Sequence, residues 1–142
     1  MAKVEASGTI PATIGDVWAV VGDFGKIADW LPPLASSGLA HGATGNQVGD
    51  VRQCMIDGGP TLSETQTARS DADHTYSYAI PEGPLPMKNY QSTIKLVPAG
   101  QETVLEWTST FEPDPGQEDE LPAMIKSVYQ AGIDHLKQHF GG

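Results

Sequence analysis

The sequence predicts an α+β fold in which a curved antiparallel sheet of seven strands wraps around one long C-terminal helix. From Glu120 to Phe140, mostly apolar residues recur at steps of three and four and form a stripe along one side of an α-helix: Leu121, Met124, Ile125, Val128, Gly132, Leu136 and Phe140. Between Leu34 and Phe111, short strand-like segments alternate with groups of Gly, Pro and Asp residues. A length of 142 residues predicts one domain, residues 1–142, with a core of its own.

The N-terminal part of the chain predicts one strand and two short helices. Apolar and polar residues alternate from Lys3 to Ile10, as in a strand with one buried face, and Pro11 ends the pattern. Thr13 is the expected N-cap of a first helix, with Asp16 in the capping-box position. A second short helix is expected from Lys26 to Leu31, where two prolines follow.

Six further strands are expected in the middle of the chain, each with turn-forming residues at its ends. They run from Leu34 to His41, Asp50 to Ile56, Thr61 to Ser70, His74 to Ile80, Lys88 to Val97 and Thr103 to Phe111. Short connections between consecutive strands favour an antiparallel meander. The final helix follows acidic residues 118–120, which suit a helix start, and is expected to stop at Gly141-Gly142.

Charge and hydropathy exclude several classes of partner. The chain has 8 basic and 18 acidic residues and a formal charge of −10, which argues against binding nucleic acid or an anionic membrane surface. No segment approaches the ~20 apolar residues of a membrane span, and the N-terminus lacks the apolar run of a signal peptide, so a cytoplasmic protein is expected. The single cysteine, Cys54, has no internal disulfide partner and is expected to be a buried, inert thiol.

Several segments resemble a known family, and they occur in the family's order. They are Gly8–Trp18, Asp23–Pro32, Gly49–Arg52, Leu85–Ser92, Glu106–Pro113 and Tyr129–Leu136. With them the chain resembles the START-like (SRPBCC) superfamily, in particular its polyketide cyclase/dehydrase-like branch, which is related to the birch pollen allergen fold. The resemblance implies a helix-grip fold and a cavity between the sheet and the long helix for a small hydrophobic, aromatic or polyketide-like ligand.

A second resemblance bears on the ligand site. Residues 89–92 are similar to a segment of the plant abscisic acid receptors, and by position this resemblance implies that Tyr90, Ser92, Glu64 and Glu106 line the cavity in a water-bridged network. It also implies mobile entrance loops, which fall at Asp57 to Thr61 and at Gly83 to Met87. The position of the receptors' carboxylate-binding lysine falls near Ala35, so a hormone receptor of that kind is not expected.

Strand alternation supports part of this site. It places Tyr90 and Ser92 on the apolar inner face of one strand, where they either satisfy each other within a core or address a ligand. The further residues expected to line the cavity are Ile56, Tyr78, Ile80, Leu85 and Met87 from the sheet and its loops, and Met124, Val128 and Gly132 from the long helix. Plain core packing is the alternative for Tyr78, Ile80 and the three helix residues, whereas Ile56, Leu85 and Met87 are expected near the mouth of the cavity. Lys88 either draws a ligand carboxylate to the entrance or is simply solvated.

The two glutamates are left with open alternatives. Glu64 either points into the cavity, where loss of hydration would raise its pKa and suit it to acid–base chemistry, or faces solvent together with Gln66. Periodicity places Leu105 and Trp107 on the buried face and Glu106 outside, whereas the resemblance places Glu106 inside. A β-bulge, or burial of parts of both faces of the strand, would reconcile the two placements.

The histidines do not predict a metal site. His135 and His139 have the i, i+4 spacing of two zinc ligands, but this helix lacks a third ligand and a general base, and His41 and His74 complete no other motif. A solvated helix face is expected, and neither a metal nor a cofactor.

Three hypotheses for function follow. In the first, the protein binds a small hydrophobic molecule as a carrier, sensor or storage protein, and is a monomer or homodimer. In the second, it is a cofactor-independent cyclase, dehydratase or aldol-type enzyme, with Glu64 as acid or base and Tyr90 and Ser92 as donors to an oxyanion. In the third, the loops at Asp57 and Gly83 bind another protein.

Overall fold

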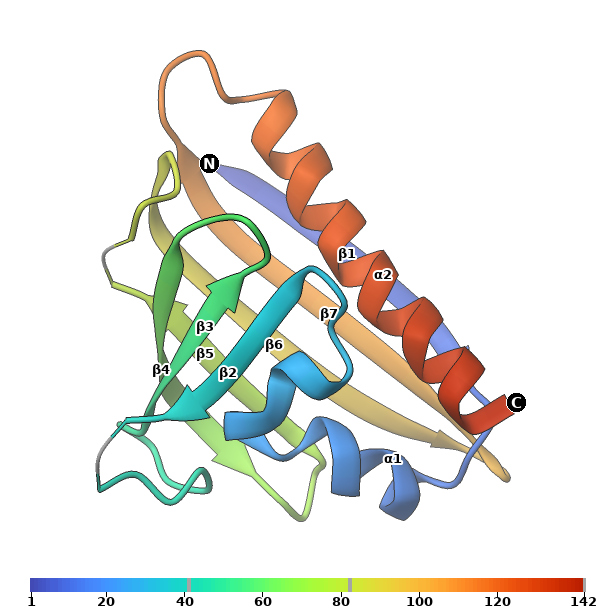
Figure 1. Ribbon diagram of the computed structural model, residues 1–142. Helices are drawn as coiled ribbons and strands as arrows, with labels where there is room; N and C mark the ends of the chain where they lie inside the picture. Colours follow the sequence, from blue (N-terminus) through green and yellow to red (C-terminus); the bar gives the residue numbers. More distant parts are fainter. Residues whose placement is uncertain (41, 82, 142) are drawn as a thin grey trace.

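A computed structural model describes residues 1–40, 42–81 and 83–141 and confirms the α+β prediction (Figure 1). The elements, in chain order, are β1 (Ala2–Ile10), α1 (Ile14–Val21), the 3-10 helix η1 (Phe24–Asp29), β2 (Leu34–Leu39), β3 (Val51–Ile56), β4 (Thr61–Ser70), β5 (Thr75–Ile80), β6 (Met87–Ala99), β7 (Glu102–Pro113) and α2 (Glu120–Gly141). The strands form one antiparallel sheet in the order β1-β7-β6-β5-β4-β3-β2.

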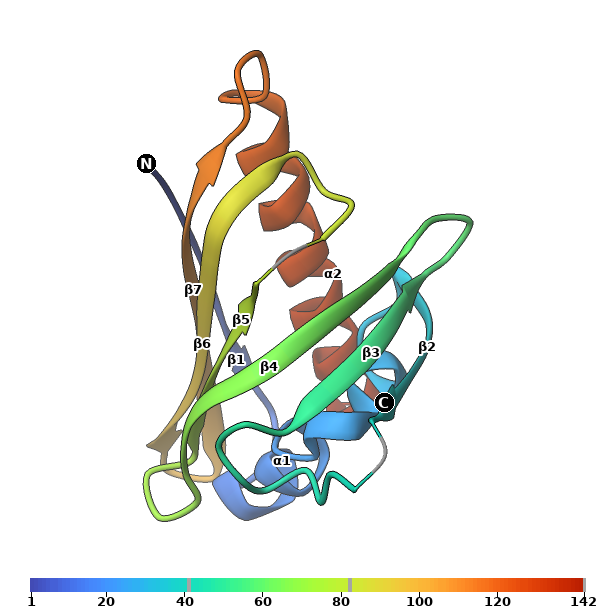
Figure 2. The ribbon, with the colours of Figure 1, turned by 90° about the vertical axis from the view of Figure 1, so that its left-hand side faces the viewer.

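The sheet curves around α2. Figure 2 shows β6 and β7 on one side of the helix and β2 and β3 on the other. Register shifts interrupt the pairing between Gln66 and Ala68 in β4 and between Lys88 and Gln91 in β6. In the second of these, Asn89 has φ of 56°, a left-handed conformation that asparagine tolerates better than most residues. Because bulges bend and twist a strand, these shifts help the sheet to wrap around the helix.

The local predictions differ from the structure at several element ends. Thr13 has the extended backbone of an N-cap, but its side chain makes no cap hydrogen bond, so the predicted capping box with Asp16 does not form. The second short helix is of the 3-10 type and begins two residues earlier than expected, at Phe24. His41 and Gly142, which were expected to end a strand and a helix, lie outside the described residues.

The buried side of α2 is rotated from the predicted stripe. Leu121, Ile125 and Leu136 are buried as expected, but Tyr129 and Ile133 share that side with them. Met124, which belonged to the predicted stripe, is 45% exposed, and the helix packs mainly on β1. Within the described residues, no helix is long and apolar enough to cross a membrane.

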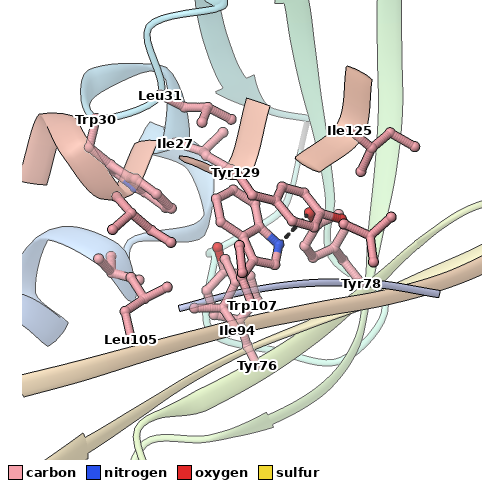
Figure 3. Close-up of a cluster of buried hydrophobic side chains, with 14 of the residues drawn as sticks. Ile27, Trp30, Leu31, Tyr76, Tyr78, Ile94, Leu105, Trp107, Ile125 and Tyr129 are labelled. Carbon is pink, nitrogen blue, oxygen red and sulfur yellow. Dashed lines mark hydrogen bonds between the residues drawn. The ribbon is translucent and has the colours of Figure 1, made fainter. Parts of the chain in front are cut away.

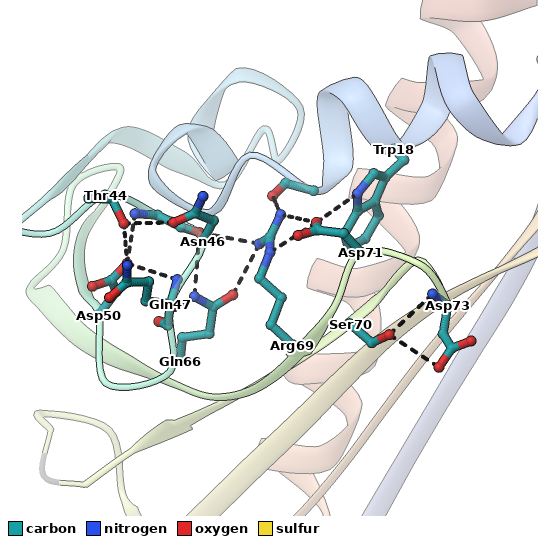
Figure 4. Close-up of polar contacts among 12 residues, drawn as sticks. Trp18, Thr44, Asn46, Gln47, Asp50, Gln66, Arg69, Ser70, Asp71 and Asp73 are labelled. Carbon is teal, nitrogen blue, oxygen red and sulfur yellow. Dashed lines mark hydrogen bonds and ion pairs between the residues drawn. The ribbon is translucent and has the colours of Figure 1, made fainter.

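Hydrogen bonds of polar side chains connect the loop before β3 to β4, and β4 to the end of α1 (Figure 4). The Gln66 amide donates to the Gln47 carbonyl at 2.8 Å, and Arg69 donates to the Gly22 carbonyl at 2.8 Å. Arg69 also forms an ion pair with Asp71 at 2.9 Å. Gln66 is fully buried, so the alternative in which it faces solvent beside Glu64 is wrong.

Gly132 lies where α2 approaches the segment after η1, and the prediction that it lines a cavity is wrong. A Cβ atom there would lie 2.8 Å from Leu31 Cδ1 and 3.0 Å from Trp30 Cζ3. The absent side chain therefore allows close packing of the helix, and it leaves no space for a ligand.

We expect Gly132→Leu to lower the free energy of unfolding by about 1–3 kcal/mol, because an overpacked core must shift to admit the new side chain. The measurement is urea unfolding followed by circular dichroism. Gly15→Ala in α1 is the matched control. A Cβ atom at Gly15 would meet nothing within 4 Å, and alanine there should stabilise α1 by up to about 1 kcal/mol. Equal stability of Gly132→Leu and the unchanged protein would contradict the steric account.

Candidate functional site

A cavity of about 320 Å³ lies between the concave face of the sheet and α2. Its walls are Ile27, Leu31, Pro33, Leu34, Ile56, Pro60, Leu62, Glu64, Tyr78, Ile80, Leu85, Met87, Tyr90, Trp107, Met124, Ile125, Val128 and Tyr129. The cavity reaches the surface, because the lining residues Pro60 and Met124 are exposed. Its volume is at the lower end of the roughly 300–1,000 Å³ of small-molecule sites. The walls are almost wholly apolar, with one carboxylate and a few hydroxyl groups among them.

The carboxylate in the wall belongs to a buried ion pair that the sequence did not predict. Arg52 and Glu64 are direct partners in the register of β3 and β4. Arg52 Nε donates to Glu64 Oε1 at 2.8 Å, and Arg52 Nη2 lies 2.8 Å from the same oxygen without the alignment of a hydrogen bond. Arg52 is fully buried and Glu64 is 7% exposed. Glu64 therefore lines the cavity, and Arg52, on the side away from the cavity, balances its charge.

The Arg52 guanidinium is held by a polar and aromatic shell. It donates to the Phe24 carbonyl at 3.0 Å and to the Tyr76 hydroxyl at 3.2 Å. It also lies over the rings of Phe24 and Tyr78, 4.2 and 4.6 Å from their centres. Burial opposes the charged form, but Tyr76 and Glu64 outweigh it and the pKa of Arg52 is raised above its ordinary value. These contacts fix the position of the Glu64 carboxylate.

A cluster of hydroxyl groups forms the other polar part of the wall. The hydroxyls of Tyr90 and Tyr129 are hydrogen bonded to each other, and Tyr129 lies 3.3 Å from Ser92 Oγ. The Trp107 indole N–H is shared between Ser92 Oγ at 3.0 Å and the Tyr78 hydroxyl at 3.3 Å, and the Trp107 ring stacks on Tyr129 (Figure 3). Burial raises the pKa of Tyr78 and Tyr90 well above the usual value of a tyrosine, so both stay protonated at neutral pH.

Most of the sequence-predicted site residues lie in this wall. Those that line the cavity are Ile56, Glu64, Tyr78, Ile80, Leu85, Met87, Tyr90, Met124 and Val128. Their contact with a ligand stays a prediction. Ser92 is buried behind Tyr90 and Tyr129 and does not line the cavity, contrary to the prediction.

Glu106 lies on the outer face of β7, so its expected place in the cavity is wrong. It is exposed, while Leu105 and Trp107 on either side are buried. The pairing of β7 with its neighbours is regular through this stretch, so the bulge that would turn Glu106 inward is absent from it. Strand periodicity placed this residue correctly, and the resemblance did not.

The sequence-based prediction missed two important residues of the site, Arg52 behind the cavity wall and Tyr129 in it. Arg52 shares a strand face with Cys54, which was expected to be buried, so alternation alone places Arg52 on the inner face. Tyr129 lies four residues after Ile125 and four before Ile133, on the buried side of α2. Both signals were present in the sequence.

Cys54 is buried, as expected, and it lies next to the ion pair of Arg52 and Glu64. Burial raises the pKa of its thiol to about 12. We therefore expect the folded protein to resist iodoacetamide at mildly alkaline pH and to react in urea, because only the thiolate is the nucleophile. Mass spectrometry of the labelled protein measures this. Rapid stoichiometric labelling of the folded protein would show that the thiol is accessible or ionised.

The histidines of α2 lie outside this site. The rings of His135 and His139 are stacked 6.4 Å apart, and His139 is exposed. Among the described residues, no three or more His, Cys, Asp or Glu side chains are grouped to hold a metal ion. His41 lies outside those residues.

Comparison with known proteins agrees with the family resemblance found in the sequence. A family model described as "Polyketide cyclase / dehydrase and lipid transport" matches residues 1–141. The structure of the protein XoxI from Bacillus cereus is 31% identical, with a TM-score of 0.89, and the match covers 99% of this chain and 96% of that one. A search of curated proteins found no match.

Two more distant structures share the fold alone. The di-domain ARO/CYC protein BexL of the BE-7585A biosynthetic pathway is 12% identical, with a TM-score of 0.79, over 97% of this chain and 46% of that one. Ara h 8.0201 is 19% identical, with a TM-score of 0.79, over 98% of this chain and 97% of that one. These matches confirm the helix-grip prediction.

Proposed function

Because the chain belongs to the polyketide cyclase/dehydrase and lipid transport family, we propose that it binds a small, mostly apolar molecule, aromatic or polyketide-like, between the sheet and α2. The observation that carries the proposal is the cavity of about 320 Å³, which reaches the surface and has an almost wholly apolar wall. Transfer of an apolar ligand from water into such a wall is favourable by about 25 cal/mol per Å² of apolar surface buried. The few polar groups in the wall would orient the ligand.

The first test is native mass spectrometry of the protein purified from its own source, followed by denaturing extraction. We expect an apolar compound at about one molecule per chain, or, if the natural ligand is lost, saturable binding of an apolar fluorescent probe. A protein that retains no compound and binds no probe would overturn the proposal.

A substitution at the mouth of the cavity locates the binding. Met124 lines the cavity and is 45% exposed, so Met124→Trp should obstruct the mouth without overpacking the core. We expect weaker probe binding and an unchanged free energy of unfolding. Ser127→Trp is the matched control, because Ser127 is an exposed residue of the same helix outside the cavity wall. Equal probe affinities in the two variants would place the binding elsewhere.

A second candidate function is a cofactor-independent cyclase or dehydratase. The observation that favours it is one carboxylate, Glu64, in an otherwise apolar wall that also holds the hydroxyl of Tyr90. Glu64 would remove a proton from the carbon beside a substrate carbonyl, and a hydroxyl of the wall would donate to the oxyanion that develops. Ser92 lies behind Tyr129 and does not fit the role of donor.

Glu64→Gln tests the enzymatic alternative with an enolisable polyketide-type substrate. Turnover should be lost while binding of an apolar probe persists, which shows that the variant is folded. Turnover that survives the substitution would remove Glu64 from the mechanism and leave binding as the function.

A further inference from the structure

The directions of the hydrogen bonds in the hydroxyl cluster follow from counting donors and acceptors. The Thr108 carbonyl only accepts, so Ser92 donates its one proton to it, at 3.0 Å. Ser92 Oγ then accepts from the Trp107 indole N–H and from the Tyr129 hydroxyl. Because Tyr129 has used its proton, the Tyr90 hydroxyl donates to Tyr129. The chain of donations therefore runs from the cavity wall towards Thr108, and Tyr90 keeps only lone pairs for a ligand.

Two further polar side chains in the wall, Glu64 and Tyr78, can form hydrogen bonds with a ligand. Arg52 engages Oε1 of Glu64, and within residues 1–40, 42–81 and 83–141 no nitrogen or oxygen donor bonds to Oε2. Tyr78 accepts the Trp107 indole N–H, so its own proton is left to donate, either to the neighbouring Tyr90 oxygen or to a ligand. The wall thus presents two acceptors, Glu64 and Tyr90, and one donor, Tyr78.

The described residues of the wall present no positive charge that could balance an anionic ligand. None of the described residues that line it is a Lys, Arg or His. Arg52 is fully buried behind Glu64, and Lys88 is exposed outside the cavity wall. A carboxylate entering this cavity would lose its hydration beside the Glu64 carboxylate without gaining a cationic partner. The formal charge of −10 on the whole chain acts in the same direction.

We infer that the cavity selects an uncharged molecule that carries a hydroxyl group, a phenol or an alcohol, over a carboxylate or a hydrocarbon of the same shape. The ligand hydroxyl donates to Glu64 Oε2, with the Tyr90 oxygen as a neighbouring acceptor, and Tyr78 donates to the ligand oxygen. This inference rests on the proposed function, because it requires the cavity to admit a ligand. For the enzymatic alternative, it makes Tyr78 rather than Tyr90 the donor to an oxyanion.

The test compares four probes that share one ring system: naphthol, methoxynaphthalene, naphthalene and naphthoate. Their affinities for the unchanged protein are measured by isothermal titration calorimetry at neutral pH. Naphthol should bind about tenfold or more tightly than methoxynaphthalene, which has the oxygen but no proton to donate, because hydrogen bonds to charged groups are the stronger ones. Naphthoate should bind most weakly.

Two variants separate the donor from the acceptor. Glu64→Gln should remove the advantage of naphthol over methoxynaphthalene and leave the affinity for naphthalene unchanged. Tyr78→Phe should weaken the binding of naphthol and of methoxynaphthalene alike, because both molecules offer an oxygen to which Tyr78 donates. If Glu64→Gln does not fold, the four affinities of the unchanged protein and the affinities of Tyr78→Phe still test the selectivity for a hydroxyl group.

The outcomes separate this inference from the proposed function. Equal affinities for naphthol and methoxynaphthalene, or tightest binding of naphthoate, would overturn the hydroxyl selectivity while ligand binding in the cavity stands. Failure of all four probes, naphthalene included, would overturn the proposed function and the selectivity with it.

Discussion

Glu64→Leu should lower the free energy of unfolding by about 3–5 kcal/mol, because it leaves the Arg52 guanidinium buried without its counter-ion. Arg52 is fully buried, and its remaining hydrogen-bond partners in the described part of the chain are the Phe24 carbonyl and the Tyr76 hydroxyl, neither of which carries a charge. The measurement is urea unfolding at neutral pH, followed by circular dichroism and tryptophan fluorescence.

A double variant separates the ion pair from mere loss of side-chain volume. Arg52→Met with Glu64→Leu removes both charges and fills the site with apolar atoms, and replacement of a whole buried pair in this way is often neutral or stabilising. The double variant should therefore regain most of the stability that Glu64→Leu loses. Glu5→Gln is the surface control, since Glu5 and Lys3 form an exposed pair and its loss should leave the unfolding midpoint unchanged. A double variant no more stable than Glu64→Leu would contradict the electrostatic account.

Trp107→Ala should lower the free energy of unfolding by about 3–5 kcal/mol, the usual cost of deleting a large buried aromatic side chain. Trp107 is 1% exposed, stacks on Tyr129 with ring centres 4.0 Å apart, and donates to Ser92 Oγ. Its loss removes a stacking contact between β7 and α2 in the wall of the cavity. The measurement is again the urea midpoint.

Trp18→Ala is the comparison for this prediction. Trp18 is half-buried, and its indole N–H donates to Asp71 at an exposed position. Fewer contacts are lost there, so the loss of stability should be clearly smaller than for Trp107→Ala. Equal losses in the two variants would mean that the stacked pair contributes no more than a surface aromatic residue. Trp107→Ala should also enlarge the cavity, so bulkier apolar probes should bind to whatever fraction remains folded.

The strands of the sheet could be predicted from the sequence because each depends on a pattern two residues long. Tyr76, Tyr78 and Ile80 alternate with smaller residues, and all three are buried on the inner face. The same rule placed Glu106 outside, where the structure has it. It also put Tyr90 and Ser92 on one face, which is correct. A strand pattern cannot say which of two inner residues is reached first from the cavity, because Tyr129, on another element, covers Ser92.

The candidate site was predictable where a residue's position depends on its own strand or helix. The ion pair of Arg52 with Glu64 depends on the register between β3 and β4, and the sequence of neither strand alone specifies that register. Gly132 illustrates the same limit on a helix. Its lack of a side chain was compatible with a cavity or with close packing, and the approach of Trp30 and Leu31 decides for packing.

By itself, the sequence determined the order of the helices and strands, which residues share a face of each strand, and the family, because these depend on local periodicity and on motifs within single segments. Only the tertiary structure decided the rotation of α2, the partner of Glu64 and the depth of Ser92, because each depends on side chains that meet from segments far apart in the chain. The hydrogen-bond directions from which we infer the ligand's chemistry belong to this second group. They require the positions of Thr108, Ser92, Tyr129 and Tyr90 together.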